Sequence, residues 1–171
     1  MYRTLALLMG LLGIHAAALA QDPCDGFSWD VKVERALFTQ GAAAIVAGLD
    51  ADHSPALTLA TGYSLALAPQ AQVRFVAGPS RKSLPDGAHA GIAKLHVARA
   101  GPYRVSLDVP AWIDVVVAGQ VVRSRAFQGR AGCNAPHKVV EYDLPAGDAW
   151  IQISGATQDH VRAAVTQSPM K

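Results

Sequence analysis

Apolar and polar residues alternate in short runs along most of this sequence, and this alternation restricts the fold more than any other feature. In YRVSLDV, residues 103–109, every second residue is apolar. A period of two places alternate side chains on opposite faces of a β-strand. Similar runs recur at intervals of roughly 10–12 residues, separated by Gly, Pro, Asp or Asn, as in β-sandwiches. We expect about ten strands, within residues 29–34, 43–47, 63–67, 73–75, 93–97, 103–109, 113–117, 121–122, 140–144, 149–153 and 161–165.

Beyond the N-terminal segment, no part of the sequence has a clear helical period. Residues 34–47 are the least clear and have room for a helical turn. The interleaved helices that an α/β fold requires are missing, and no long linker divides the chain. The pattern therefore predicts an all-β fold, an antiparallel β-sandwich or jelly roll, formed by a single domain of residues 21–171.

The first residues have the composition of a signal peptide. Arg3 supplies a positive charge, Leu5–Ile14 is apolar, and Ala18–Ala20 has the small-x-small form that signal peptidase recognises. We expect residues 1–20 to be removed by cleavage before Gln21. The apolar run is too short for a membrane span of about 20 residues. The mature chain is therefore expected to be periplasmic or secreted, with no membrane span.

Two cysteines, Cys24 and Cys133, follow the expected cleavage position. In an exported chain, an even number of cysteines indicates disulfide bonding. A pair allows only one intramolecular connectivity, so we predict a Cys24–Cys133 disulfide that ties the mature N-terminus to the loop before a late strand. Closure of such a long loop stabilises the fold by about 4–5 kcal/mol.

Trp112 and Asp114 are candidate ligand-binding residues. In the segment 112–117, residues 113, 115 and 117 form the better core face, so Trp112 and Asp114 share the opposite face. An indole beside a carboxylate suits a sugar ring, which stacks on the aromatic face while its hydroxyls bond the carboxylate. The alternative is structural: Trp112 covers the rim of the sandwich and Asp114 bonds a nearby turn or arginine.

Arg123 and Arg125 form a second candidate binding feature. They are two residues apart, so in a strand both would lie on one face and could bind an anion. A solvated charged face is the other interpretation.

A metal site is conceivable at His137, Glu141 and His160. Two histidines and one carboxylate are the ligands of non-haem iron sites. The spacing is irregular for a cupin, because Ala135 stands where the H-x-H pair would begin, and after Pro145–Gly147 no histidine follows until His160. Solvated strand and loop histidines are the alternative, in which case there is no metal.

The charge balance gives no reason to expect a nucleic-acid partner. The chain has 15 Lys and Arg residues against 13 Asp and Glu residues. Phosphate binding requires clustered cations, and the densest basic groups are only Arg81–Lys82 and Arg123/Arg125.

Three stretches carry a resemblance. They are AGPYRVSLDVPAWIDVV, FQGRAGC at Phe127–Cys133, and VEYDLPAG with IQISGA, between Val140 and Ala156. Together they resemble a group of small, poorly characterised exported proteins of Gram-negative bacteria, some of which are labelled homogentisate 1,2-dioxygenase. The chain is more distantly similar to pre-peptidase C-terminal domains and carbohydrate-binding modules. That likeness implies a β-sandwich with an accessory, non-catalytic role.

These observations favour an exported, non-catalytic binding or accessory protein of the periplasm, with a protein or a glycan as ligand and no cofactor. Two alternatives stay open. One is a small iron-dependent dioxygenase that uses His137, Glu141 and His160. The other is a structural envelope protein whose Val-rich hairpin, Val115–Val122, pairs with the sheet edge of a partner.

Overall fold

The computed structural model describes residues 22–169, which form two facing six-stranded sheets. The expected signal peptide lies outside the described residues. One sheet has the order β1 (Ala43–Val46), β3 (Gly62–Ala66), β12 (His160–Gln167), β6 (Gly101–Leu107), β10 (Lys138–Leu144), β9 (Ala126–Gly129). The other has the order β2 (Ala56–Leu57), β5 (His89–Val97), β11 (Gly147–Ala156), β7 (Trp112–Val117), β8 (Gln120–Val122), and β4 (Ala68–Pro69) pairs with β5 outside this order.

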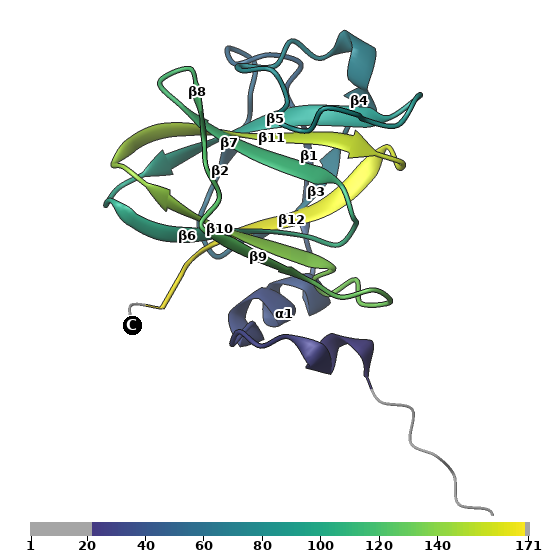
Figure 1. Cartoon of the computed structure of the whole chain (residues 1–171), viewed down its shortest axis with the longest axis vertical. Helices are drawn as coiled ribbons and strands as arrows, with labels where there is room; N and C mark the ends of the chain where they lie inside the picture. Colours follow the sequence, from purple (N-terminus) through teal and green to yellow (C-terminus); the bar gives the residue numbers. More distant parts are fainter. Residues whose placement is uncertain (1–21, 170–171) are drawn as a thin grey trace, which may run out of the picture.

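The core lies between the sheets, and the alternating residues supply it. Val105 of β6 pairs with Val140 of β10 and Val165 of β12, and all three are buried. Ile151 of β11 pairs with Val115 of β7 in the facing sheet. The predicted β-sandwich is therefore confirmed. Figure 1 shows the two sheets one above the other, with the long strands of each running across the molecule.

Both sheets are also covered on their outer faces, which the sequence did not indicate. On β6, Arg104 and Ser106 are buried although they point away from the core. On β7 and β11, Asp114 and Gln152 are buried in the same way. The cover of the first sheet is a helix, and that of the second is the segment between β4 and β5. Polar residues that the alternation would place in water therefore lie under these covers.

The helix α1 (Lys32–Thr39) corrects the strand expected at residues 29–34. Its buried residues Glu34 and Phe38 are one turn apart, and Val31 precedes them at the same face. Arg162 of β12 donates hydrogen bonds to carbonyl groups of the last helical turn, which otherwise lack partners. Figure 1 shows α1 below the sheet that contains β12.

Three further details differ from the sequence prediction. The sheets are mixed, because β1 runs parallel to β3 and β2 runs parallel to β5. Val73 and Phe75 lie not in a strand but after a short 3-10 helix, η2 (Gln70–Gln72), in the cover of the second sheet. Residues 22–169 contain twelve strands, and the short strands β2, β4 and β9 were not predicted.

The predicted disulfide is confirmed. Cys24 and Cys133 are joined by an S–S bond of 2.06 Å, with their Cα atoms 5.0 Å apart. Cys24 belongs to the 3-10 helix η1 (Pro23–Gly26), and Cys133 lies between β9 and β10. The bond thus fixes the segment that leads into α1 against the first sheet.

Two further expectations concern surface and membrane. The hairpin Val115–Val122 was expected to be exposed, but its residues Val115 and Val116 are fully buried. The hairpin therefore does not present all its valines at the surface. Among residues 22–169, no helix has the length and the apolar character that crossing a bilayer requires.

Candidate functional site

A hollow of about 310 Å³ lies at the side of the sandwich where β7 and β8 approach β10. Trp112, Asp114 and Arg123, three of the four predicted binding residues, contribute to its lining. Ser80 comes from the cover of the second sheet, and Tyr142 comes from β10 of the first sheet. The hollow is thus formed by elements from both sheets and from one loop.

Asp114 is held within the protein. It is only 3% exposed. Its carboxylate accepts hydrogen bonds from the backbone N–H of Ser80 (3.0 Å), from the Ser80 hydroxyl, and from Trp112 Nε1 (3.2 Å). These three donors match the structural interpretation, in which Asp114 bonds a nearby turn. Asp114 therefore positions Ser80 and the indole and is not an open acceptor for sugar hydroxyls.

Gln152 also holds the loop that contains Ser80, residues 76–80, against the sheet. It pairs directly with Asp114 across β11 and β7. Its Oε1 accepts hydrogen bonds from the backbone N–H groups of Val76 (2.6 Å) and Ala77 (3.1 Å), and its Nε2 donates to the Ala77 carbonyl (2.9 Å). Two buried polar side chains on neighbouring strands therefore fix residues 76–80 onto the sheet. This holds Ser80 beside Trp112.

Trp112 is partly exposed, and two cations lie over its ring. The Lys138 Nζ atom is 4.9 Å from the ring centroid, and the Arg81 guanidinium carbon is 5.8 Å from it. Lys138 also donates a hydrogen bond to the carbonyl of Ala111 (3.1 Å). Burial and the neighbouring Arg81 charge lower the pKa of Lys138, although Asp114 acts in the opposite direction.

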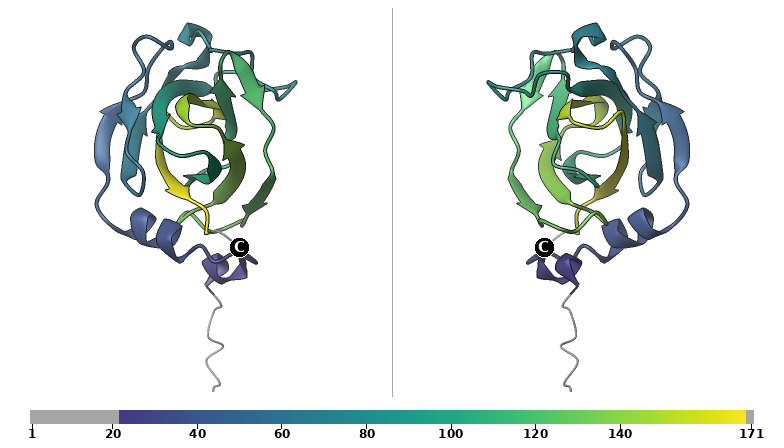
Figure 2. Two further views of the ribbon diagram at one scale, coloured as in Figure 1. Left: turned by 90° about the vertical axis from the view of Figure 1, so that its left-hand side faces the viewer. Right: turned by 90° about the vertical axis from the view of Figure 1, so that its right-hand side faces the viewer.

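Arg123 and Arg125 do not share a face. Residues 123–125 form no strand but link β8 of one sheet to β9 of the other. Figure 2 shows this green part of the chain on the side opposite the blue strands β1 and β3. Arg123 lines the Trp112 hollow, whereas Arg125 turns to the first sheet, with its Nη1 3.2 Å from Asp143 Oδ1. The expected convergence of the two arginines therefore does not occur.

The three candidate iron ligands lie apart and have other partners. His137 Nδ1 is 3.2 Å from the Cys133 carbonyl, and His160 Nδ1 is 3.0 Å from Asp159 Oδ1. Glu141 pairs with Arg104, and Arg104 pairs with Thr166 of β12. Thr166 is six residues from His160 along this strand, so the level of Glu141 in the sheet is about 20 Å from His160. No group of three or more His, Cys, Asp or Glu residues that could hold a metal occurs between residues 22 and 169.

A second hollow, of about 510 Å³, is lined in part by Arg104 and Glu141, which belong to a buried ion network that the sequence did not predict. Arg104 lies between Glu34 of α1 (Nη1 to Oε1, 3.4 Å) and Glu141 of β10 (Nε to Oε2, 3.3 Å). The guanidinium carbon of Arg104 is 4.9 Å from the Trp29 ring centroid. Glu34 also accepts a hydrogen bond from Thr166. The network joins α1 to the outer face of the first sheet.

The surroundings of Glu141 favour its ionised form. Partial burial opposes its charge, but a hydrogen bond from Ser168 (2.7 Å) and the charges of Arg104 and Arg125 outweigh burial and lower its pKa. No sequence signal links these residues, because Arg104 and Glu34 are separated by 70 positions.

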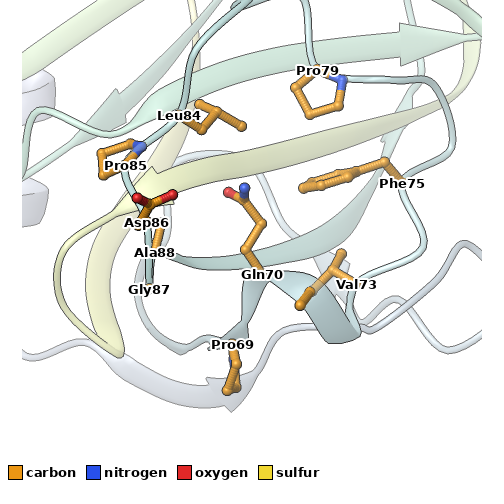
Figure 3. Close-up of a pocket in the computed structure, with 11 residues that line it drawn as sticks. Pro69, Gln70, Val73, Phe75, Pro79, Leu84, Pro85, Asp86, Gly87 and Ala88 are labelled. Atoms are coloured by element: carbon orange, nitrogen blue, oxygen red, sulfur yellow. The ribbon is translucent and has the colours of Figure 1, made fainter.

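A third hollow, of about 590 Å³, is formed by the cover of the second sheet. Figure 3 shows Leu84 and Pro85 on one side, Phe75 and Pro79 on the other, and Gln70 between them. The Oε1 of Gln70 accepts a hydrogen bond from the N–H of Gly155 (2.8 Å) and so serves the fold. The remaining lining is mainly apolar and offers few groups for recognition of a polar ligand.

Comparisons with known proteins add no function. No known family model matches this chain. A search of curated proteins likewise finds no match. The resemblance to small exported proteins therefore remains a prediction, and functional reasoning depends on the Trp112 hollow itself.

Proposed function

We propose that this protein is an exported, non-catalytic binding protein whose Trp112 hollow receives a sugar ring of a glycan. The observation that carries this proposal is the placement of Trp112, a partly exposed indole at the wall of a hollow of about 310 Å³. Binding sites combine such an apolar surface with a few polar groups that fix the orientation of the ligand. Here Ser80, Arg123 and Ser124 supply those groups.

The roles of the residues differ from those expected of a simple indole–carboxylate pair. Trp112 provides the stacking surface, and Asp114 fixes the indole N–H and Ser80 in place. Because an Arg guanidinium carries five N–H donors, Arg123 is suited to sugar hydroxyl and carboxylate oxygens. A prealigned indole loses little conformational entropy on binding, which favours affinity.

The disulfide supports the exported part of the proposal. Disulfides persist in oxidising compartments such as the bacterial periplasm and the extracellular space, and they are rare in the cytosol of most cells. The Cys24–Cys133 bond therefore agrees with a chain that acts outside the cytoplasm.

Isothermal titration calorimetry of the mature chain against a panel of soluble oligosaccharides tests the proposal. We expect binding to at least one oligosaccharide, and a loss of about tenfold or more in affinity for Trp112→Ala, which corresponds to about 1.4 kcal/mol. Trp150→Ala is the matched control, because Trp150 lies on the same sheet face with Lys94 over its ring (5.6 Å). Equal losses in both variants, or no binding to any oligosaccharide, would contradict the proposal.

A further inference from the structure

Three cations lie around Trp112, and none of them forms an ion pair with a carboxylate among the described residues. Arg81 and Lys138 lie over the indole, and Arg123 lines the same hollow. Among the ion pairs of residues 22–169, none within 4.0 Å includes any of the three. The one carboxylate in the lining, that of Asp114, is already engaged by Ser80 and Trp112. The surroundings of Trp112 therefore contain three cations and one carboxylate, and Arg123 is the cation that lines the hollow itself.

The second tryptophan–cation pair on this sheet shows the contrast. Lys94 lies over Trp150 at 5.6 Å, and its Nζ also forms an ion pair with Asp148 at 2.7 Å. Arg104 and Arg125 are likewise paired with carboxylates. Positive charge is thus balanced at these other sites and left unbalanced at the Trp112 hollow.

Unbalanced charge in a partly buried position has an energetic cost that an anion would remove. Lys138 is half-buried, and both its burial and the charge of Arg81 disfavour its ionised form. A carboxylate bound beside Trp112 would reduce this cost. Guanidinium groups also bind carboxylates in a bidentate manner, which adds geometric selectivity.

We infer that the ligand of the Trp112 hollow is an acidic sugar, a uronic acid residue whose ring packs against the part of Trp112 that lines the hollow and whose carboxylate is attracted by Arg123 in the lining and by the nearby Arg81 and Lys138. This inference rests on the proposed function and names its ligand class. The cations lie around one tryptophan and form no stripe, so they suit a single acidic group and not a nucleic-acid backbone.

The test compares two ligands that share one sugar backbone and differ at their carboxyl groups: trigalacturonate, which is charged, and its fully methyl-esterified form, which is neutral. Both are titrated against the mature protein by calorimetry. We expect the acid to bind about tenfold or more tightly than the ester. This advantage should shrink when salt is raised from about 50 to about 500 mM, because exposed charges are screened over shorter distances.

Variants assign the effect to the hollow. Arg123→Ala and Lys138→Met should each remove most of the advantage of the acid over the ester. Arg99→Ala should leave it unchanged, because the exposed Arg99 follows β5 at the end away from Trp112. Urea unfolding of each variant separates a loss of binding from a loss of folding.

The outcomes distinguish the inference from the proposed function. Equal affinity for acid and ester would overturn the acidic ligand and leave glycan binding in place. If neither sugar binds anywhere but a glutamate-rich peptide binds with the same dependence on Arg123 and Lys138, the hollow serves an acidic protein segment and both sugar proposals fail. Free galacturonate binding as tightly as the trimer would indicate a small-molecule site instead of a polysaccharide site.

Discussion

Asp114 shows how a residue chosen as a candidate ligand contact acts instead through its neighbours. Its carboxylate is buried in an outward-facing position and accepts three hydrogen bonds from Ser80 and Trp112. A buried acceptor of this kind is costly to remove, because its donors lose their partner without regaining water.

Asp114→Ala should therefore destabilise the fold by about 1–3 kcal/mol. Chemical denaturation followed by far-UV circular dichroism measures the change. Asp143→Ala is the control: Asp143 is exposed and paired only with the half-exposed Arg125, so its loss should cost less than about 1 kcal/mol. Similar costs for the two variants would show that Asp114 does not hold the loop.

Lys138 should give the stability a dependence on alkaline pH. Burial and the charge of Arg81 outweigh the opposing charge of Asp114 and leave the pKa of Lys138 below the ordinary value of 10.5, while Trp112 packs against its ammonium group. Just below pH 10.5, the folded state then binds fewer protons than the unfolded state. The free energy of unfolding therefore rises as the pH rises through this window, because Lys138 no longer has to be buried in its charged form.

We expect the stability of the wild type to gain on that of Lys138→Met between neutral pH and about 11. Urea midpoints of both proteins across this range measure the difference. A difference that stays constant with pH would contradict the lowered pKa of Lys138.

The candidate site was predictable from the sequence in part. A period of two correctly placed Trp112 and Asp114 on one face of a strand, and both line the same hollow as Arg123. The alternation says nothing about which distant segment covers that face. Ser80, which engages Asp114, is 34 positions away, and Lys138 comes from the opposite sheet. Such contacts depend on tertiary packing and leave no local pattern.

At the scale of elements, α1 is the clearest difference between expectation and structure. The residues WDVKVE alternate as in a strand, and a helix of eight residues is too short to display its own period. Its buried face also includes a charged residue, Glu34, which breaks the apolar stripe. The helix is stabilised by its contacts with β12 and with Arg104, and these contacts are not visible in the local sequence.

Glu34→Ala tests the attachment of α1. It leaves the buried Arg104 with one carboxylate fewer, and removal of one partner from a buried ion pair costs about 3–5 kcal/mol. We expect about 3 kcal/mol, because Glu141 still faces Arg104. Thermal and urea unfolding provide the measurement.

Two further variants check the cause of that loss. The double variant Glu34→Ala/Arg104→Met should recover part of the stability, since no unpaired buried charge remains. Lys32→Ala, on the exposed face of α1, should have almost no effect. A cost below about 1 kcal/mol for Glu34→Ala would mean that the helix is attached by apolar packing alone.

At the scale of the whole molecule, two facing sheets and one disulfide hold the Trp112 hollow in a fixed shape. These global features were the ones that the sequence predicted best, because alternation and a single cysteine pair leave few other arrangements. The hollow lies where the chain passes from one sheet to the other, between β8 and β9. A ligand in this hollow would therefore contact residues from both sheets.

The indole N–H signals of the three tryptophans give the most direct test of binding at this hollow. In a ¹⁵N-correlated NMR spectrum of the protein expressed as residues 21–171, each indole gives one signal, and Trp112→Phe identifies that of Trp112. On addition of trigalacturonate we expect the Trp112 signal to shift in a saturable manner while those of Trp29 and Trp150 stay in place. Shifts of Trp29 or Trp150 with an unmoved Trp112 signal would contradict this account.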